Sequence, residues 1–433
     1  MQALLKTLLQ HIVRHGNLVV TMPGGEVCVF GDGTGKRAGF AVADAGTALQ
    51  LFIDPDLHFG EAYMDGAVTV TNGTIHDVLA VLFDNAAKVS APLSLDLPYA
   101  IRRRIKRLQQ ANPIGRAREN VAHHYDLSGA LYDLFLDKDR QYSCAYYEQH
   151  GQGLEAAQLA KKRHLAAKLM IEPGMKVLDI GSGWGGLGLY LAETCGAQVT
   201  GVTLSAEQFK LSNQRARERG LDEQVQFLLK DYRELEGEFD RIVSVGMFEH
   251  VGIRHYGEMF AKVRELLHKD GVFVLHSIGR AGGPGATSAW IQRYIFPGGY
   301  APALSEVMPE VERAGLYTTD VEILRLHYAR TLAEWRKRFA ARRDEAVALY
   351  DERFARMWEF YLSSSELSFR HFGLNNFQLQ ATRHQEALPL TRDYIMREEN
   401  RLKRLERAHS RQPVRKVRHA PGESGHYPQL SKQ

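Results

Sequence analysis

The sequence predicts an α/β protein in which a doubly wound sheet follows a small N-terminal α+β domain. Two observations favour the doubly wound sheet. A short apolar strand, 177–180, leads into a glycine-rich loop, and a helix-forming segment begins at Leu187. Short strands then alternate with helical segments across residues 119–390, as in sheets that helices cover on both faces. A long charged helical segment, 332–362, interrupts this alternation before a final strand at 375–382.

Residues 1–90 are predicted to form the small α+β domain. The segment 4–13 is an apolar-rich helix, and residues 19–30 alternate around Pro23-Gly24-Gly25, which is a typical hairpin signal. Further strand and helix signals continue as far as Phe83. We expect this domain to contact lipid or to mediate dimerisation.

Residues 91–118 are predicted to be a basic linker, because they contain three prolines and, from residue 101 onward, basic side chains without an acid. These basic residues are Arg102, Arg103, Arg104, Lys106, Arg107, Arg116 and Arg118. Such a run attracts polyanions, either nucleic acid or an anionic lipid surface. Residues 391–433 are predicted to contain the end of a helix and a disordered tail, in which the basic stretch 411–419 is solvated.

Composition is typical of a soluble globular protein, with 44% apolar and 24% charged residues and a formal net charge of +4 over 433 residues. The three cysteines, Cys28, Cys144 and Cys195, are too widely spaced for a metal cluster and too few for a disulfide framework. A reducing cytoplasm is therefore expected. No apolar run approaches the ~20 residues that span a bilayer, and the N-terminus lacks a signal-peptide pattern.

The glycine loop at 181–186 has four glycines in six positions, which lets a backbone turn sharply and press against a bound nucleotide. A nicotinamide dinucleotide requires an acid about 20 residues later. The next strand ends instead in Thr203-Leu204-Ser205, and the bulky Trp184 stands where a pyrophosphate would pass. Asp231 and Tyr232 follow the third strand and suit the edge and face of an adenine. The pattern therefore favours a nucleotide-type cofactor other than a dinucleotide.

Six further motifs lie in the larger domain. They are NVAHHYDL at 120–127, YSCAY at 142–146, GMFEHVG at 246–252, HSIG at 276–279, YIFPGG at 294–299 and HYARTL at 327–332. Together with the glycine loop, they closely resemble the cyclopropane-fatty-acyl-phospholipid synthases, which have the class I S-adenosylmethionine-dependent methyltransferase fold. The resemblance covers residues 113–385 in the family's order and spacing. Residues 59–66 resemble the family's N-terminal domain more loosely.

The resemblance implies a reaction, two small molecules and a set of partners. An alkene is a poor nucleophile, so it needs the electrophilic methyl of S-adenosylmethionine and close alignment. Methyl transfer to an unsaturated fatty acyl chain of a phospholipid leaves a carbocation, and bound bicarbonate removes a proton to close a cyclopropane ring. The implied partners are a membrane surface contacted peripherally from the cytoplasm and unsaturated acyl chains, and a homodimer stays open. No nucleic acid and no metal are implied.

The resemblance also carries the family's site onto this chain. The implied catalytic set is Cys144, Glu249, His276, Ile278 and Tyr328. The implied cofactor contacts are Tyr142, Ser143, Gly181, Ser182, Gly183, Trp184, Gly185, Thr203, Leu204, Gln208, Asp231, Tyr232 and Arg233. Taken singly, such residues have plainer interpretations, because a lone cysteine or histidine is more often a buried core residue. Their joint occurrence within the family's motifs favours a site.

Three other functions stay open at this point. The same machinery makes a methyl or methylene branch if the carbocation loses a different proton. A nucleic-acid methyltransferase could use the basic linker, although the sequence contains no recognised RNA-binding motif. A non-catalytic lipid carrier is disfavoured by the complete cofactor loop. The aromatic residues Trp290, Tyr294, Phe296 and Tyr300 are expected either in the core or in the wall of an acyl-chain site, and the absence of cysteine after Cys195 argues against a catalytic cysteine late in the chain.

Overall fold

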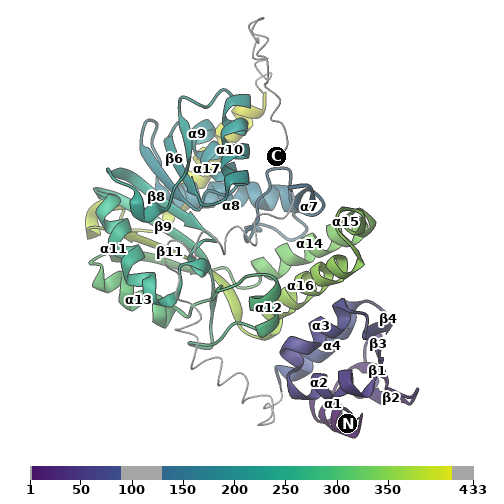
Figure 1. The fold of residues 1–433 in the computed structure, drawn as a ribbon. Coiled ribbons are helices and arrows are strands. Elements are labelled where there is room, and N and C mark those ends of the chain that lie inside the picture. The colour runs from purple at the N-terminus through teal and green to yellow at the C-terminus, as the bar shows by residue number, and fades with distance from the viewer. Residues whose placement is uncertain (1, 89–128, 412–433) are drawn as a thin grey trace, which may run out of the picture.

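The computed structural model describes residues 2–88 and 129–411 (Figure 1). The predicted basic linker, the 120–127 motif and the tail beyond residue 411 lie outside the described residues. The described chain builds two sheets, one of four strands and one of seven.

The seven-stranded sheet has the order β10-β11-β9-β8-β5-β6-β7. Its strands are β5 (Lys176–Ile180), β6 (Gln198–Thr203), β7 (Val225–Leu229), β8 (Phe239–Val245), β9 (Leu267–Arg280), β10 (Tyr317–Ile323) and β11 (Leu374–Thr382). Neighbouring strands are parallel from β7 to β9, whereas β11 is antiparallel to both of its neighbours. The predicted doubly wound sheet is therefore confirmed, with one reversed strand near its edge.

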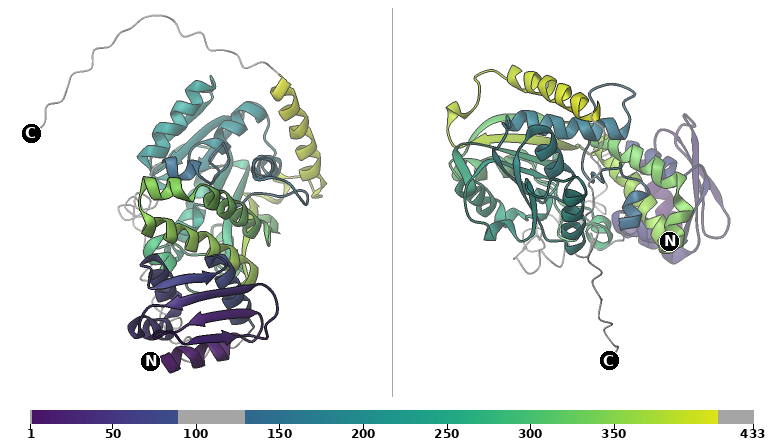
Figure 2. Two further views of the ribbon diagram at one scale, coloured as in Figure 1. Left: turned by 90° about the vertical axis from the view of Figure 1, so that its right-hand side faces the viewer. Right: turned by 90° about the horizontal axis from the view of Figure 1, so that it is seen from above.

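Helices cover both faces of this sheet (Figure 2). One face carries α8 (Leu154–Leu169), α9 (Gly186–Cys195), α10 (Ala206–Glu218) and α17 (Asp393–Arg411). The other face carries α11 (Tyr256–Leu266) and α13 (Leu304–Arg313). Short elements fill the connections: α7 (Gly129–Asp133), η1 (Tyr232–Glu234), η2 (Phe248–His250), η3 (Ile253–His255), α12 (Ala289–Tyr294) and η4 (Gln385–Ala387).

The predicted helical insertion before the last strand is confirmed, but it is three helices rather than one. They are α14 (His327–Ala341), α15 (Arg343–Leu349) and α16 (Glu352–His371). Asp351 begins α16 because its side chain accepts a hydrogen bond from the amide of Phe354, at 2.7 Å. The chain therefore returns to the sheet from the side of the insertion, where β11 enters between β9 and β10.

The small N-terminal α+β domain is also confirmed. Its sheet has the order β2-β1-β3-β4, with β1 (Asn17–Thr21), β2 (Val27–Phe30), β3 (Arg37–Val42) and β4 (Val68–Asn72). Its helices are α1 (Gln2–Ile12), α2 (Ala45–Ile53), α3 (Pro55–Met64) and α4 (Ile75–Ala86). The predicted hairpin joins β1 and β2, and Gly24 and Gly25 have φ of +92° and +91°. Glycine tolerates these angles without a steric penalty.

The N-terminal domain packs on the helical insertion and α12 through helix α3, which explains the loosely family-like motif at 59–66. Gly60 lies directly against the indole of Trp290, where a Cβ would overlap the ring. Glu61 accepts hydrogen bonds from Arg293 Nη1 at 2.8 Å and from the Tyr294 hydroxyl at 2.9 Å. The Phe59 ring stacks 6.3 Å from that of Phe360 in α16. A residue without a side chain at position 60 is what permits this close contact.

We expect Gly60→Leu to destabilise the protein by roughly 1–3 kcal/mol, because the new side chain overpacks the contact with Trp290. Thermal unfolding should show a lower midpoint for this variant. Gly282→Leu is the matched control, because a Cβ there meets no atom within 4 Å. Equal midpoints for the two variants would contradict this account of the domain contact.

His164 in α8 links the edge strand β10 to helix α17. Its two ring nitrogens lie 2.7 Å from Glu322 in β10 and 2.7 Å from Glu399 in α17. Burial lowers the pKa of His164, but the two carboxylates outweigh burial and the net pKa is raised. The charged ring therefore stabilises the folded state, and Lys168 shares Glu322 at 2.6 Å.

The raised pKa of His164 predicts a pH-dependent stability. The contribution should be complete below the unfolded histidine pKa of about 6.5 and should be lost as the pH rises through the raised folded value. Denaturant unfolding at a series of pH values measures the difference in the free energy of unfolding between the parent and His164→Gln. We expect that difference to shrink as the pH rises, and a difference that grew with pH would oppose the assignment.

Candidate active site

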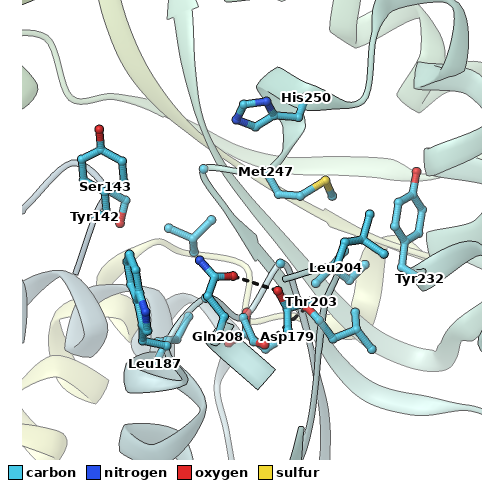
Figure 3. A pocket seen from close by; sticks show the side chains of 18 of the residues that line it. Tyr142, Ser143, Asp179, Leu187, Thr203, Leu204, Gln208, Tyr232, Met247 and His250 are labelled. Atoms are coloured by element: carbon cyan, nitrogen blue, oxygen red, sulfur yellow. Dashed lines mark hydrogen bonds between the residues drawn. The ribbon is translucent and has the colours of Figure 1, made fainter. Parts of the chain in front are cut away.

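A cavity opens at the carboxyl ends of the parallel strands β5, β6 and β8, which is where α/β sheets place ligands (Figure 3). All but one of the predicted cofactor residues line it. They are Tyr142, Ser143, Gly181, Ser182, Gly183, Trp184, Thr203, Leu204, Gln208, Asp231, Tyr232 and Arg233. The structure thus brings together segments that are as many as 91 positions apart, from Tyr142 to Arg233.

The glycine loop has three residues in the left-handed region, Gly181, Gly183 and Gly185, with φ of +81°, +54° and +81°. A Cβ on Gly183 would meet no atom within 4 Å, because the position opens into the cavity. Gly185 is the exception among the predicted contacts. A Cβ there would lie 2.6 Å from Phe227 Cζ, so Gly185 serves the packing of α9 against the sheet and does not line the cavity.

Thr203 and Gln208 occupy the place where a dinucleotide-binding protein has an acid. The Thr203 hydroxyl donates to Gln208 Oε1 at 2.8 Å (Figure 3). Ser205 caps α10 and accepts from the Gln208 amide at 3.3 Å. Both polar side chains are buried and are held by the start of the helix. They supply hydroxyl and amide groups at this strand end without a negative charge.

Asp231 is oriented by its neighbour Arg233. Its carboxylate accepts from Arg233 Nε at 2.9 Å and Nη2 at 2.7 Å, and from the Arg233 backbone amide at 3.0 Å. The same carboxylate caps the single turn η1. The Arg233 guanidinium also lies 5.8 Å from the centre of the Tyr232 ring. The three predicted residues therefore form one fixed group at the end of β7.

Helix α8 holds the Tyr142–Ser143 side of the cavity in place. Lys161 Nζ donates to Gln141 Oε1 and to Ser143 Oγ, both at 2.7 Å. Gln158 Nε2 donates to the carbonyl of Ser143 at 3.0 Å. Lys161 is completely buried, and burial lowers its pKa to about 8. This buried amine and amide tie the loop to the helix.

Glu249 and Ile278 meet beside the cavity. Glu249 follows β8 in the turn η2, and its Oε1 accepts from the Ile278 amide at 2.6 Å. Burial raises the pKa of Glu249 to about 7, even though this hydrogen bond lowers it. Its Oε2 is buried and has no hydrogen-bond partner among the described residues. The carboxyl group therefore keeps one oxygen for a ligand.

His276 lies within the adjoining strand β9, opposite Val245 at the end of β8. Its carbonyl accepts from the Gly246 amide at 2.9 Å, which aligns the end of β8 with β9. Burial lowers the pKa of His276 well below its usual value, so the ring is neutral. Its Nδ1 lies 3.1 Å from Gln378 Nε2, and its Nε2 has no partner in the described part of the chain.

The chain beside Cys144 is fixed to helix α14, which carries Tyr328 in its first turn. The Ala145 amide donates to Thr331 Oγ1 at 3.1 Å, one turn beyond Tyr328. Cys144 is buried, and burial raises the pKa of its thiol above the usual range. A protonated thiol is a poor nucleophile, and Cys144 is not among the residues that line the cavity. Tyr328 packs against Phe369, with ring centres 4.9 Å apart.

A family model described as mycolic acid cyclopropane synthetase matches residues 114–379, which include every residue of both predicted sets. This chain belongs to that family. The predicted family is thereby confirmed, and with it the prediction that the protein is an enzyme of the S-adenosylmethionine-dependent methyltransferase class.

Relatives of this family member extend the match beyond the catalytic sheet. A cyclopropane-fatty-acyl-phospholipid synthase of Escherichia coli (strain K12) is 38% identical over 362 residues, 80% of this chain and 91% of the relative. A probable fatty acid methyltransferase of Pseudomonas putida is 41% identical over 292 residues, 64% of this chain and 74% of the relative. The solved structure of mycolic acid cyclopropane synthase CmaA1 complexed with SAH and CTAB gives a TM-score of 0.58 at 33% identity, covering 61% of this chain and 97% of that chain.

Three of the four aromatic residues that the sequence left between core and acyl-chain wall have structural contacts in this family member. Trp290 packs against Gly60, the Tyr294 hydroxyl donates to Glu61, and the Tyr300 hydroxyl donates to Glu306 at 2.6 Å. Phe296 differs, because its ring lies 5.8 Å from that of His250, which lines the cavity. Phe296 therefore lies beside the cavity, and the Tyr300 amide donates to the carbonyl of Glu249 at 2.9 Å.

Sequence reasoning missed several residues of this site. Asp179, at the end of β5, lines the cavity, and burial raises its pKa to about 7. Met247 and His250 also line it, and burial lowers the pKa of His250 to about 4, so that ring is neutral. Asp179 lies in the strand before the glycine loop, and Met247 and His250 lie in the motif at 246–252. Their place in these segments was the signal that could have identified them.

The described residues contain no group of three or more His, Cys, Asp or Glu side chains placed to hold a metal ion. Within residues 2–88 and 129–411, no helix has the length and apolarity needed to cross a bilayer.

Proposed function

We propose that this protein transfers a methylene group from S-adenosylmethionine to the double bond of an unsaturated fatty acyl chain in a phospholipid, and so forms a cyclopropane ring. The observation that carries the proposal is a juxtaposition. The cavity lined by the glycine loop adjoins Glu249 and His276, two buried polar side chains that each keep one atom without a hydrogen-bond partner in the part of the chain that the structure describes. A methyl donor and a small polar group could therefore meet the same acyl chain.

We assign the donor to the cavity lined by Tyr142 to Arg233. The cavity wall joins backbone from the glycine loop with uncharged Thr203 and Gln208, an oriented carboxylate at Asp231 and the ring of Tyr232. These groups suit ribose hydroxyls and an adenine. Neutral His250 and Met247 also line the cavity and add no positive charge. A cationic sulfonium is tolerated better beside neutral groups than beside cations.

We further propose that bicarbonate is the base that removes the proton from the new methyl group. The residues present fit a small anion. With a pKa of about 7, the Glu249 carboxyl carries a proton for much of the time at neutral pH, and then it donates to an anion without repelling it. Neutral His276 offers a ring nitrogen, and buried Lys161 adds positive charge nearby.

A second candidate product is a methyl-branched or methylene-branched chain. The relative from Pseudomonas putida, which is 41% identical, is described as a probable fatty acid methyltransferase, and this favours keeping the alternative. The same groups would bind the donor and the acyl chain. The fate of the carbocation would then depend on which proton lies nearest to the base.

Lipid mass spectrometry of a host that makes unsaturated but no cyclopropane fatty acids tests the proposed function. Expression of the protein should add the mass of one CH2 to unsaturated phospholipid chains. Ozone cleaves a chain that still has a double bond and leaves a cyclopropane ring intact. A product that carries the added mass and resists ozone therefore contains the ring. Unchanged chains in cells that contain the folded protein would overturn the proposal.

We also propose that the protein works at the cytoplasmic face of a membrane, with the basic linker as an electrostatic contact. This rests on the sequence, because residues 102–107 lie outside the described residues. Each basic residue near an anionic surface contributes about 1 kcal/mol, which salt screens. Substituting glutamine for Arg102, Arg103, Arg104, Lys106 and Arg107 should weaken binding to anionic vesicles and reduce its salt dependence.

Affinity for S-adenosylmethionine should be the same in this linker variant and the parent. Equal vesicle binding at low salt would move the membrane contact away from the linker, most directly to helix α1.

A further inference from the structure

Strands β9 and β11 place an amide beside the buried histidine of the site. Their antiparallel register pairs Gln378 directly with His276, so the two side chains lie on the same face of the sheet. Both side chains are fully buried. Gln378 Nε2 lies 3.1 Å from His276 Nδ1. The contact is therefore closed to water and joins one amide nitrogen to one ring nitrogen.

The direction of this hydrogen bond decides which ring nitrogen of His276 carries the proton. With the Gln378 amide nitrogen facing the ring, Nδ1 accepts and carries no hydrogen, whereas the opposite amide orientation would place Oε1 there and require hydrogen on Nδ1. A neutral imidazole keeps one hydrogen, which then resides on Nε2. That atom is buried and has no partner among the described residues. His276 therefore presents an N–H group toward the site.

A second unpaired donor lies on the same face. Asn376 is two residues from Gln378 on β11 and pairs with Ile278 on β9. Its Nδ2 is buried and, in the described part of the chain, also lacks a partner. Residues two apart on a strand point to the same face. Two N–H donors that lack a partner among the described residues thus share one face of β9 and β11, and Glu249 contacts the same stretch of β9 through the Ile278 amide.

We propose that Gln378 is a positioning residue that holds His276 in the tautomer with hydrogen on Nε2, so that His276 acts as a hydrogen-bond donor to a small oxyanion and not as the base. The proposal rests on the proposed function, in which that anion is bicarbonate. The proposal assigns anion binding and proton removal to different groups. His276 binds the anion through its N–H, and the anion accepts the proton.

Nitrogen NMR of the protein with labelled histidine reads the tautomer directly. The chain has 18 histidines, so the His276 signals are assigned by their loss in His276→Gln. In the parent protein, without added bicarbonate, we expect a protonated Nε2 and an unprotonated Nδ1. A protonated Nδ1 in the parent would overturn the proposal, and this measurement needs no folded variant of Gln378.

Gln378→Met removes the donor with little change in size. We expect the His276 signals to shift toward a mixture of tautomers, and the bicarbonate concentration for half-maximal turnover to rise by about 10- to 100-fold, as when the partner that orients a histidine is removed. Affinity for S-adenosylmethionine should stay the same. Unchanged His276 signals in a folded Gln378→Met protein would contradict the proposal.

Gln380→Met is the matched control. Gln380 lies on the same face, and its Nε2 donates to the Lys168 carbonyl and the Tyr394 hydroxyl, both at 2.6 Å, rather than to His276. This variant should lose stability but keep the His276 signals and the bicarbonate response. If the NMR result is as expected while turnover is independent of bicarbonate, the tautomer assignment stands and the anion in the proposed function fails.

Discussion

Gly183→Val is expected to abolish binding of S-adenosylmethionine. Position 183 opens into the cavity, and a Cβ there meets no protein atom within 4 Å, so the branched side chain fills space that the ligand needs. Backbone strain is a separate effect, because φ is +54° and a residue with a Cβ costs about 1–2 kcal/mol in this region. Calorimetric titration of the folded variant measures the affinity.

Gly220→Val separates strain from obstruction. Gly220 also has positive φ, +66°, with no atom within 4 Å of an added Cβ, but it follows α10 and does not line the cavity. This control should lose a similar amount of stability and keep its affinity. If Gly183→Val bound the ligand as tightly as the control, the cavity would not be the cofactor site.

Glu249→Ala is expected to lower turnover by roughly 10²–10⁴-fold, the usual contribution of a group that organises proton transfer. It removes the carboxyl group that accepts from the Ile278 amide and keeps a second oxygen for a ligand. Glu249 is not among the residues that line the proposed cofactor cavity, so affinity for S-adenosylmethionine should be nearly intact. Steady-state kinetics and calorimetry measure the two quantities independently.

Glu249→Gln distinguishes structure from chemistry at this position. The amide oxygen can keep the hydrogen bond from Ile278, whereas the group can no longer titrate near its present pKa of about 7. Turnover should stay low, and the pH dependence that this group gives the parent should disappear. Loss of S-adenosylmethionine affinity equal to the loss of turnover would assign Glu249 a structural role only.

The elements around the cofactor cavity could be predicted from the sequence because each has a local signal. An apolar strand followed by glycines at 181–185 encodes β5 and its loop, and short apolar runs encode β6, β7 and β8. The reversed direction of β11 had no such signal, because it depends on the path of the three helices before it. The break between α14 and α15 at Arg342 likewise interrupts a continuous helical pattern.

The support that helix α8 gives to the site could not be predicted from the sequence, because it depends on tertiary packing. Lys161 and Gln158 resemble solvent-exposed helix residues in sequence, since charged and polar side chains are rarely buried. In the fold, α8 is covered by the sheet on one side and by α17 on another, so both side chains are buried and turn toward the Tyr142–Ser143 loop. Gly185 was assigned to the cofactor from its place in the loop, although Phe227, 42 positions later, is what requires a glycine there.

The most direct test of ring formation uses S-adenosylmethionine with a fully deuterated methyl group, the purified protein and vesicles of unsaturated phospholipid. The account predicts a chain that gains one carbon, keeps two of the three deuterons and resists ozone, because one deuteron leaves as the ring closes. A product that keeps all three deuterons, or one that ozone still cleaves, would contradict ring closure and assign the protein to branched-chain synthesis.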